Sequence, residues 1–142
     1  MIEVQPNSQE HAALFALGLK QFSEGQYFEC HETWEAYWKP LEAGVEKNLV
    51  QGLIQVSVAY HHWHNGNVKG ALRLVERALP RITEALPVSM GLDLTSYFDK
   101  LLKEHAKLQA LQSSKLEDGA TGESGELADL RPDAPRLIQL EK

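Results

Sequence analysis

The stretch from Tyr27 to Trp38 constrains the fold most, because it combines five aromatic rings with a histidine and three carboxylates. At about 100° per residue, a helix places one set of these side chains on a single face: Tyr27, His31, Trp34, Glu35 and Trp38. A face this apolar packs inward, so His31 and Glu35 should lie in or beside the core. Buried ionisable groups are costly unless paired, so this pair needs a structural or functional explanation.

Apolar residues recur at helical spacing along most of the chain, and no segment gives a convincing strand pattern. The first helix should begin at the capping residue Ser8 and close before Gly25. The others are expected at 27–39, 45–64, 68–79 and 94–112. Pro80 should kink or restart the fourth helix, which would then continue to Pro87. The helix at 45–64 is apolar nearly all round, which predicts a central position.

A weak internal repeat aligns Phe22-Ser-Glu-Gly25-Gln-Tyr with Trp63-His-Asn-Gly66-Asn-Val. In both copies an apolar helix reaches an aromatic residue, a glycine turn follows, and a second helix begins. This pattern resembles stacked tetratricopeptide hairpins, but a solenoid normally needs three repeats. We therefore predict an all-α fold, a compact bundle of about five helices built from two stacked helical hairpins. Gly52 and Gly70 are expected at close helix–helix contacts.

The 142 residues suffice for one domain with a tail. Residues 1–112 should form the bundle, and the acidic, glycine-rich residues 113–130 should form a flexible linker. Residues 131–142 regain apolar character, so we expect them to dock back on the bundle as an extended strap.

The net charge of −6 argues against nucleic acid or an anionic membrane as the main partner. No apolar run approaches a membrane span, and the N-terminus lacks the pattern of a signal peptide. We therefore expect a soluble, cytoplasmic protein. Cys30 is the only cysteine, so no intramolecular disulfide can form, and a buried inert thiol is expected.

The segment from His31 to Glu35 resembles the zinc-protease pattern H-E-x-x-H, with Glu35 in place of the second histidine. A carboxylate can also bind metal, but one histidine and one carboxylate are too few ligands. His62 is the best further candidate, because it projects from the central helix in a narrow polar stripe with Gln51 and Gln55. The metal candidates are thus His31, Glu35 and His62.

Two other interpretations remain open for the same residues. In the structural one, His31 and Glu35 satisfy each other beneath Trp34 and Trp38 and fix the register of two helices. In the other, the cluster lines a small-molecule or catalytic pocket. There Glu32 or Glu35 would act as a base and His31 or His62 as an acid.

Several motifs together resemble the bacterial, archaeal and plant family called domain of unknown function 309. They are Gly25-x-Tyr-Phe-x-x-His31-Glu32-x-Trp-Glu35-x-x-Trp38, then Gln51-Gly-Leu-Ile-Gln55, His62, and Gly66-Asn67-x-x-Gly70-Ala71. The resemblance covers about residues 12–80. It implies a small all-helical protein without an established activity. It also implies a short C-terminal segment like Pro135-Arg-Leu-Ile-Gln-Leu140.

Three classes of function follow. The first is a protein that binds a small ligand or a metal, with or without catalysis, through His31, Glu32, Glu35 and His62. The second is a protein-interaction module that uses a groove between hairpins. The third is a homo-oligomer in which the cluster is only a structural clasp. The sequence identifies no cofactor, substrate or partner.

Overall fold

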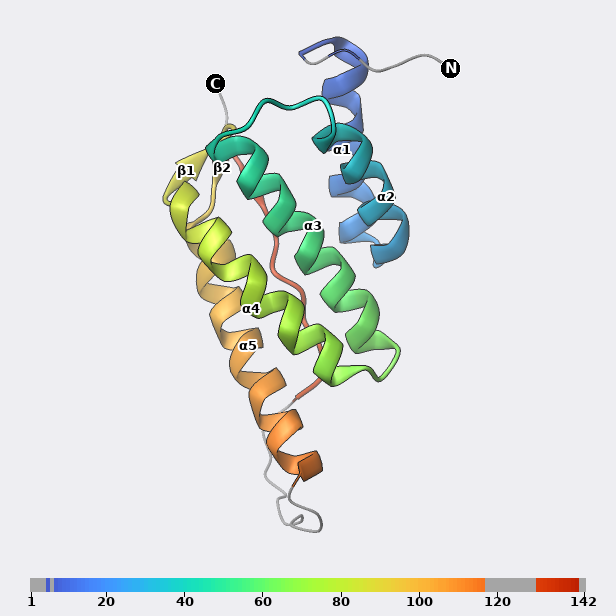
Figure 1. The fold of residues 1–142 in the computed structure, drawn as a ribbon, viewed down its shortest axis with the longest axis vertical. Coiled ribbons are helices and arrows are strands. Elements are labelled where there is room, and N and C mark those ends of the chain that lie inside the picture. The colour runs from blue at the N-terminus through green and yellow to red at the C-terminus, as the bar shows by residue number, and fades with distance from the viewer. Residues whose placement is uncertain (1–4, 6, 117–129, 141–142) are drawn as a thin grey trace.

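Five helices, each packed on the next in chain order, make up the fold (Figure 1) of the computed structural model, which describes residues 5, 7–116 and 130–140. They are α1 (Gln9–Ser23), α2 (Tyr27–Trp38), α3 (Val45–His64), α4 (Val68–Ala85) and α5 (Thr95–Leu116). This arrangement confirms the predicted all-α bundle. The central position of α3 is also confirmed, because Leu49, Leu53 and Val56 are fully buried.

The α1–α2 turn and the α3–α4 turn have the same geometry, which supports the internal repeat. Gly25 and Gly66 adopt φ angles of 77° and 83°, which favour glycine. The N–H of the next residue then donates back into the preceding helix, from Gln26 to Gln21 O and from Asn67 to His62 O, each at 2.8 Å. Both hairpins are thus closed by the same glycine C-cap.

Two helices differ from their predicted course. Helix α4 continues through Pro80 to Ala85, so of the two expected outcomes at Pro80, a kink or a restart, the restart is wrong. Pro80 is exposed, while Ala78 and Ile82 on either side are buried and continue the apolar stripe. Helix α5 extends to Leu116, so the first residues of the expected 113–130 linker are helical. The rest of that linker, residues 117–129, lies outside the described residues.

Three short strands were not expected from the sequence. They are β1 (Val88–Ser89), β2 (Leu92–Asp93) and β3 (Ile138–Gln139), antiparallel in the order β1-β2-β3. Met90 and Gly91 form the turn between β1 and β2, both with positive φ, as a tight hairpin requires. Strands of two residues are too short to show alternation, which explains why they were missed.

Two glycines allow close contacts between neighbouring helices, one between α1 and α2 and one between α3 and α4. A Cβ on Gly18 of α1 would lie 2.1 Å from Trp34 Nε1. The absence of a side chain at Gly18 therefore leaves room for the indole ring of Trp34. A Cβ on Gly52 would lie 3.1 Å from Arg81 Cβ of α4, which confirms the predicted close contact there. At Gly70 it would instead meet Asn67, the N-cap of the same helix, so the expected helix–helix contact is wrong.

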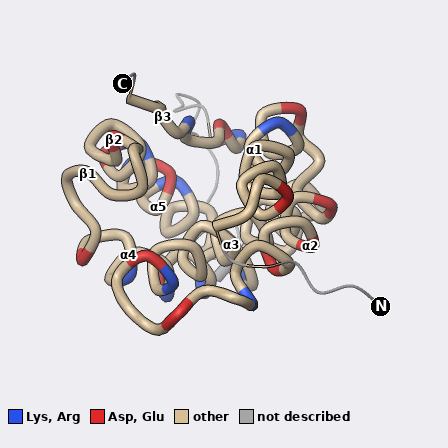
Figure 2. The backbone as a smooth tube through the Cα atoms, turned by 90° about the horizontal axis from the view of Figure 1, so that it is seen from above, with Lys and Arg blue, Asp and Glu red and all other residues tan. Residues whose placement is uncertain are grey.

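The C-terminal segment, residues 130–140, lies along the face to which α1, α3 and α5 contribute. In Figure 1 it passes behind α3, and Figure 2 shows it between α1 and α5 on the side away from α4. It ends as β3 on the edge of β2, and Leu140 N donates to Gly91 O at 2.8 Å. Residues 130–140 therefore cover part of this face. None of the described helices is long and apolar enough to cross a membrane.

Candidate functional site

The predicted pair of His31 and Glu35 forms on α2, with 3.5 Å between His31 Nε2 and Glu35 Oε2. The side chains are 25% and 48% exposed, so the pair lies beside the core rather than within it. His31 Nδ1 is shielded from solvent and has no hydrogen-bond partner among the residues that the structure describes. The contact is therefore a partly solvated i,i+4 pair of an imidazole and a carboxylate.

The two tryptophans that were expected to cover this pair make their main contacts elsewhere. Trp34 is buried, stacks on Phe15 at 5.4 Å and donates from Nε1 to Phe15 O at 3.2 Å. Trp38 Nε1 donates to Lys47 O at 3.0 Å, and the Lys47 ammonium lies over its ring. The first ring fastens α2 to α1, and the second fastens it to the start of α3.

The remaining predicted residues do not assemble into a metal site with this pair. Gln51 is partly buried and Glu32 is exposed. Gln55 Oε1 is shielded from solvent and has no hydrogen-bond partner within the described part of the chain. The ring of His62 lies nearest to that of His61, at 5.9 Å. Among the residues that the structure describes, no three His, Cys, Asp or Glu side chains are grouped to hold a metal ion.

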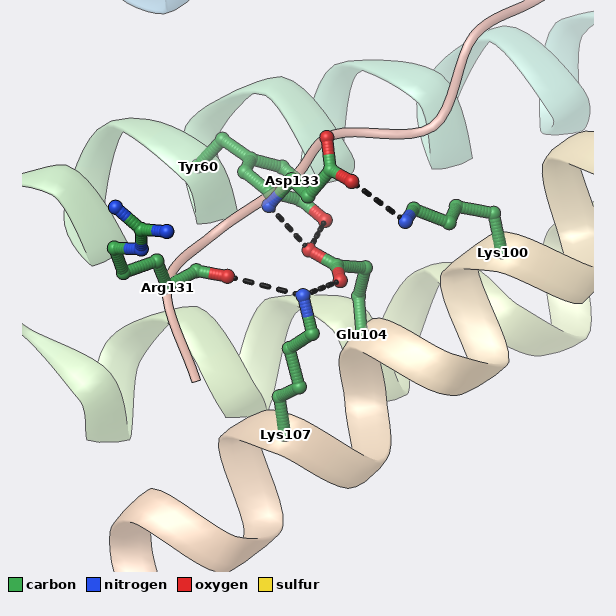
Figure 3. Close-up of polar contacts among 6 residues, drawn as sticks. All are labelled: Tyr60, Lys100, Glu104, Lys107, Arg131 and Asp133. Carbon is green, nitrogen blue, oxygen red and sulfur yellow. Dashed lines mark hydrogen bonds and ion pairs between the residues drawn. The ribbon is translucent and has the colours of Figure 1, made fainter. Parts of the chain in front are cut away.

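A buried carboxylate that the sequence prediction missed lies on α5. Glu104 is fully buried, and its Oε1 accepts hydrogen bonds from the Tyr60 hydroxyl at 2.8 Å and from Asp133 N at 2.7 Å (Figure 3). Its Oε2 lies 2.6 Å from Lys107 Nζ. Glu104 therefore joins α3, α5 and the C-terminal segment through one desolvated charge, with two hydrogen-bond donors on Oε1 and the Lys107 ammonium as the ion-pair partner of Oε2.

Lysines on α5 complete the contacts to the segment (Figure 3). Lys107 Nζ also donates to Arg131 O at 3.0 Å, and Lys100 Nζ pairs with Asp133 Oδ2 at 2.7 Å. The hydrogen bond and positive charge of Lys100 hold the pKa of Asp133 below its ordinary value. Burial, followed by the charge of Glu104, raises the pKa of Tyr60, so its hydroxyl stays a neutral donor.

These contacts bind mainly the backbone of an extended chain. Over 131–133, one carbonyl, one N–H and one carboxylate are each held by a charged side chain of α5. Pro132 lies within this region, and the buried Pro135 follows it. Proline favours an extended conformation and lowers the entropy lost on docking. The side chains of α5 thus hold this extended segment mainly through its backbone.

The sequence contained one signal for Glu104, its spacing. Glu104 falls at helical spacing with Tyr97, Leu101 and Leu108, all of them buried on α5. A carboxylate within an apolar stripe should find buried donors, because an unpaired charge there is prohibitively costly.

A cavity of about 600 Å³ separates the C-terminal segment from the last turns of α1. Tyr27 at the start of α2 and His64 at the end of α3 also line it. Burial, followed by the charge of Asp133, raises the pKa of Tyr27. The segment thus fills the face only in part, and an open space remains on its α1 side.

Comparisons with known proteins give a family but no activity. Residues 15–74 match the family described as "Domain of unknown function (DUF309)". Over 92 residues the chain is 32% identical to the uncharacterized protein YpuF of Bacillus subtilis (strain 168). That alignment covers 63% of this chain and 52% of YpuF, so the chain spans about half of its relative's length. No solved structure matches the chain. The resemblance that the motifs predicted is confirmed, since residues 15–74 match the model of that family.

Proposed function

We propose that this protein is an interaction module that binds an extended, proline-containing segment along the face of α1, α3 and α5. The observation that carries the proposal is the bonding of the backbone at 131–133 by Glu104 and Lys107. In this proposal the C-terminal segment is an intramolecular occupant, and an acidic segment of a partner protein takes its place. Lys100 then pairs with the partner's carboxylate as it does with Asp133.

The stacking of the helices supports this proposal. Because each helix packs on the next in sequence, α1, α3 and α5 alternate with α2 and α4. Arrays of helical hairpins use such a surface to bind extended chains. The bonds to backbone atoms supply affinity that does not depend on sequence, whereas the pairing with an acidic side chain supplies selectivity.

A partner must compete with the protein's own C-terminal segment. A covalently attached segment can compete at an effective concentration of roughly 1 mM. A partner of equal intrinsic affinity would therefore displace little of it at micromolar concentration. A partner segment must bind more tightly than residues 130–140, or a separate event must first release them.

A cleavable connection tests whether the face binds a segment that is not covalently attached. A protease recognition sequence would replace residues 121–126 of the full chain, and the product would be cleaved and passed over a sizing column. We expect the released C-terminal fragment to remain with the helices. Excess synthetic peptide of residues 130–142 should then displace it.

The matched control is the same peptide with Asp133→Lys, which places a cation opposite Lys100. It should displace the fragment far more weakly, since like charges would meet where Lys100 and Asp133 now pair. Immediate loss of the fragment on cleavage would reject the proposal. Equal displacement by the two peptides would reject the selectivity for acidic segments.

A second candidate function is a small-ligand or metal site between α2 and α3. Two solvent-shielded atoms, His31 Nδ1 and Gln55 Oε1, favour it, because neither has a hydrogen-bond partner among the described residues. Buried polar atoms usually have such a partner. Elemental analysis of the parent and the His31→Ala variant, purified without added metal, tests the metal form of this candidate. Metal in the parent alone would support it, and metal in neither would reject it.

We also propose that the protein acts in the cytoplasm and does not use nucleic acid or a membrane as its main partner. The net charge of −6 supports the exclusion of polyanionic partners. A second copy of the chain could supply the extended segment, which would give a homo-oligomer. Sedimentation at increasing protein concentration tests this case, and a persistent monomer would reject it.

A further inference from the structure

The cavity between α1 and the C-terminal segment has the size of a small-molecule site. Its volume of about 600 Å³ falls within the range of roughly 300–1,000 Å³ that is usual for ligand pockets. The last turns of α1 form one wall, and residues 132–137 with Gln139 form the opposite wall. The space therefore exists only when the segment is docked.

One side of the cavity is a continuous row of rings. Phe22 meets the edge of Tyr27 at 5.1 Å, and Tyr27 stacks on His64 at 5.4 Å. Within the described part of the chain, the Tyr27 hydroxyl makes no hydrogen bond. A flat aromatic molecule could pack on these rings, and the free hydroxyl could donate to it.

The uncompensated charge in the cavity is positive, although the whole chain is acidic. Lys20 on α1 and Arg136 on the segment both line it. Neither forms an ion pair within residues 7–116 and 130–140. The one carboxylate on the lining, Asp133, is already paired with Lys100. The cavity thus offers two available cations, from opposite walls, to a ligand's anionic group.

We propose that this cavity binds a small aromatic anion, with the ring on Tyr27 and the anionic group at Lys20 and Arg136. This site is separate from the proposed peptide contact and requires only that the segment be docked. Because the segment supplies one wall, a bound anion favours the docked state and opposes displacement by a partner. The same molecule would thereby regulate access to the face of α1, α3 and α5.

Titration of the full chain with 8-anilinonaphthalene-1-sulfonate, an aromatic sulfonate, tests the proposal by fluorescence. The parent should bind one equivalent saturably, and the double variant Lys20→Ala/Arg136→Ala should bind at least about tenfold more weakly. Ser23→Trp changes an exposed residue of the lining and should block the site by filling it. Circular dichroism would confirm that each variant is folded.

Two controls separate this site from general effects. Lys39→Ala/Arg73→Ala removes two exposed cations outside the cavity, makes the same change in net charge, and should bind as the parent does. Lys20→Arg/Arg136→Lys keeps both charges and should retain binding. The proposal is overturned by no saturable binding below about 1 mM. Equal affinity in the parent and the Lys20→Ala/Arg136→Ala variant, or unchanged binding by Ser23→Trp, would also overturn it.

Discussion

The hydroxyl of Tyr60 donates to Glu104 Oε1 at 2.8 Å, and the same oxygen accepts the backbone N–H of Asp133. One carboxylate therefore connects the central helix, the last helix and the C-terminal segment. A buried carboxylate is costly, and the two hydrogen bonds to Oε1 together with the ion pair to Lys107 offset that cost. Removal of the carboxylate should affect both the stability of the helices and the position of the segment.

Substitution Glu104→Gln should lower the free energy of unfolding by about 2–4 kcal/mol, because it removes a buried charge and leaves the Lys107 ammonium without its ion-pair partner. The glutamine side chain has the size of glutamate and keeps one oxygen acceptor, so the variant should still fold. Urea denaturation measures the loss. Residues 131–140 should also become sensitive to proteolysis.

Tyr60→Phe is the graded control for the same network. It removes one of the two hydrogen-bond donors to Oε1 and leaves Glu104 bonded to Asp133 N and paired with Lys107, so a loss of about 1 kcal/mol is expected. A loss for Glu104→Gln no greater than that for Tyr60→Phe would contradict the assigned role of the carboxylate.

Gly18→Ala should destabilise the α1–α2 hairpin. The added Cβ would lie 2.1 Å from Trp34 Nε1, so the indole or the helix must shift, at about 1–3 kcal/mol or more. The tryptophan fluorescence should also change, because the environment of the Trp34 indole changes. Ala16→Ser, at an exposed position of the same helix, should stay within about 0.5 kcal/mol of the parent. Equal stability of Gly18→Ala and the parent would show that this contact is not as tight as described.

Alkaline pH should destabilise the protein through Cys30. Burial raises the pKa of its thiol from 9 to about 12, so the unfolded chain loses this proton first as pH rises. The free energy of unfolding should therefore fall from about pH 9 upward, by at most about 1.4 kcal/mol per pH unit from this group. The raised pKa values of Tyr60 and Tyr97 act in the same direction at higher pH.

The variant Cys30→Ala isolates the contribution of the thiol. Urea denaturation at pH 8 and pH 10 should show a smaller difference for the variant than for the parent. The thiol of the folded parent should also resist alkylation at pH 8, since it is buried and neutral. Identical pH dependence of the two proteins would remove Cys30 as the cause.

Glu35→Gln should change the free energy of unfolding by less than about 0.5 kcal/mol, because a partly exposed i,i+4 pair contributes little. Glu32→Gln, at an exposed position of the same helix, is the matched control. A loss of several kcal/mol for Glu35→Gln alone would instead favour the structural clasp. Small losses in both would leave ligand binding as the better explanation of this pair.

The sequence predicted the helices well because their ends carry local signals. Residues 45–64 were predicted as the third helix and form α3 with the same bounds, and Gly25 and Gly66 close the two hairpins as the repeat indicated. The course of α4 through Pro80 could not be predicted locally. There the apolar contacts on both sides of the proline outweigh its missing hydrogen bond.

The candidate site was harder to predict, because periodicity tells which side chains point inward but not which helix they meet. Trp34 was placed correctly on an inward face, yet it packs on Phe15 of α1 instead of covering His31. Glu104 binds a segment that is distant in sequence, and no local pattern specifies that partner. The cavity beside the segment likewise depends on the docking of residues 130–140.

The most direct measurement is the amide hydrogen exchange of Asp133 in the full chain, followed by NMR. If an extended segment is bound on this face, the Asp133 N–H is held by Glu104 and should exchange at least about a hundredfold more slowly than an unprotected amide. The protection should largely disappear in Glu104→Gln. Exchange of Asp133 at the unprotected rate in the parent, while the amides of α3 remain protected, would contradict the account.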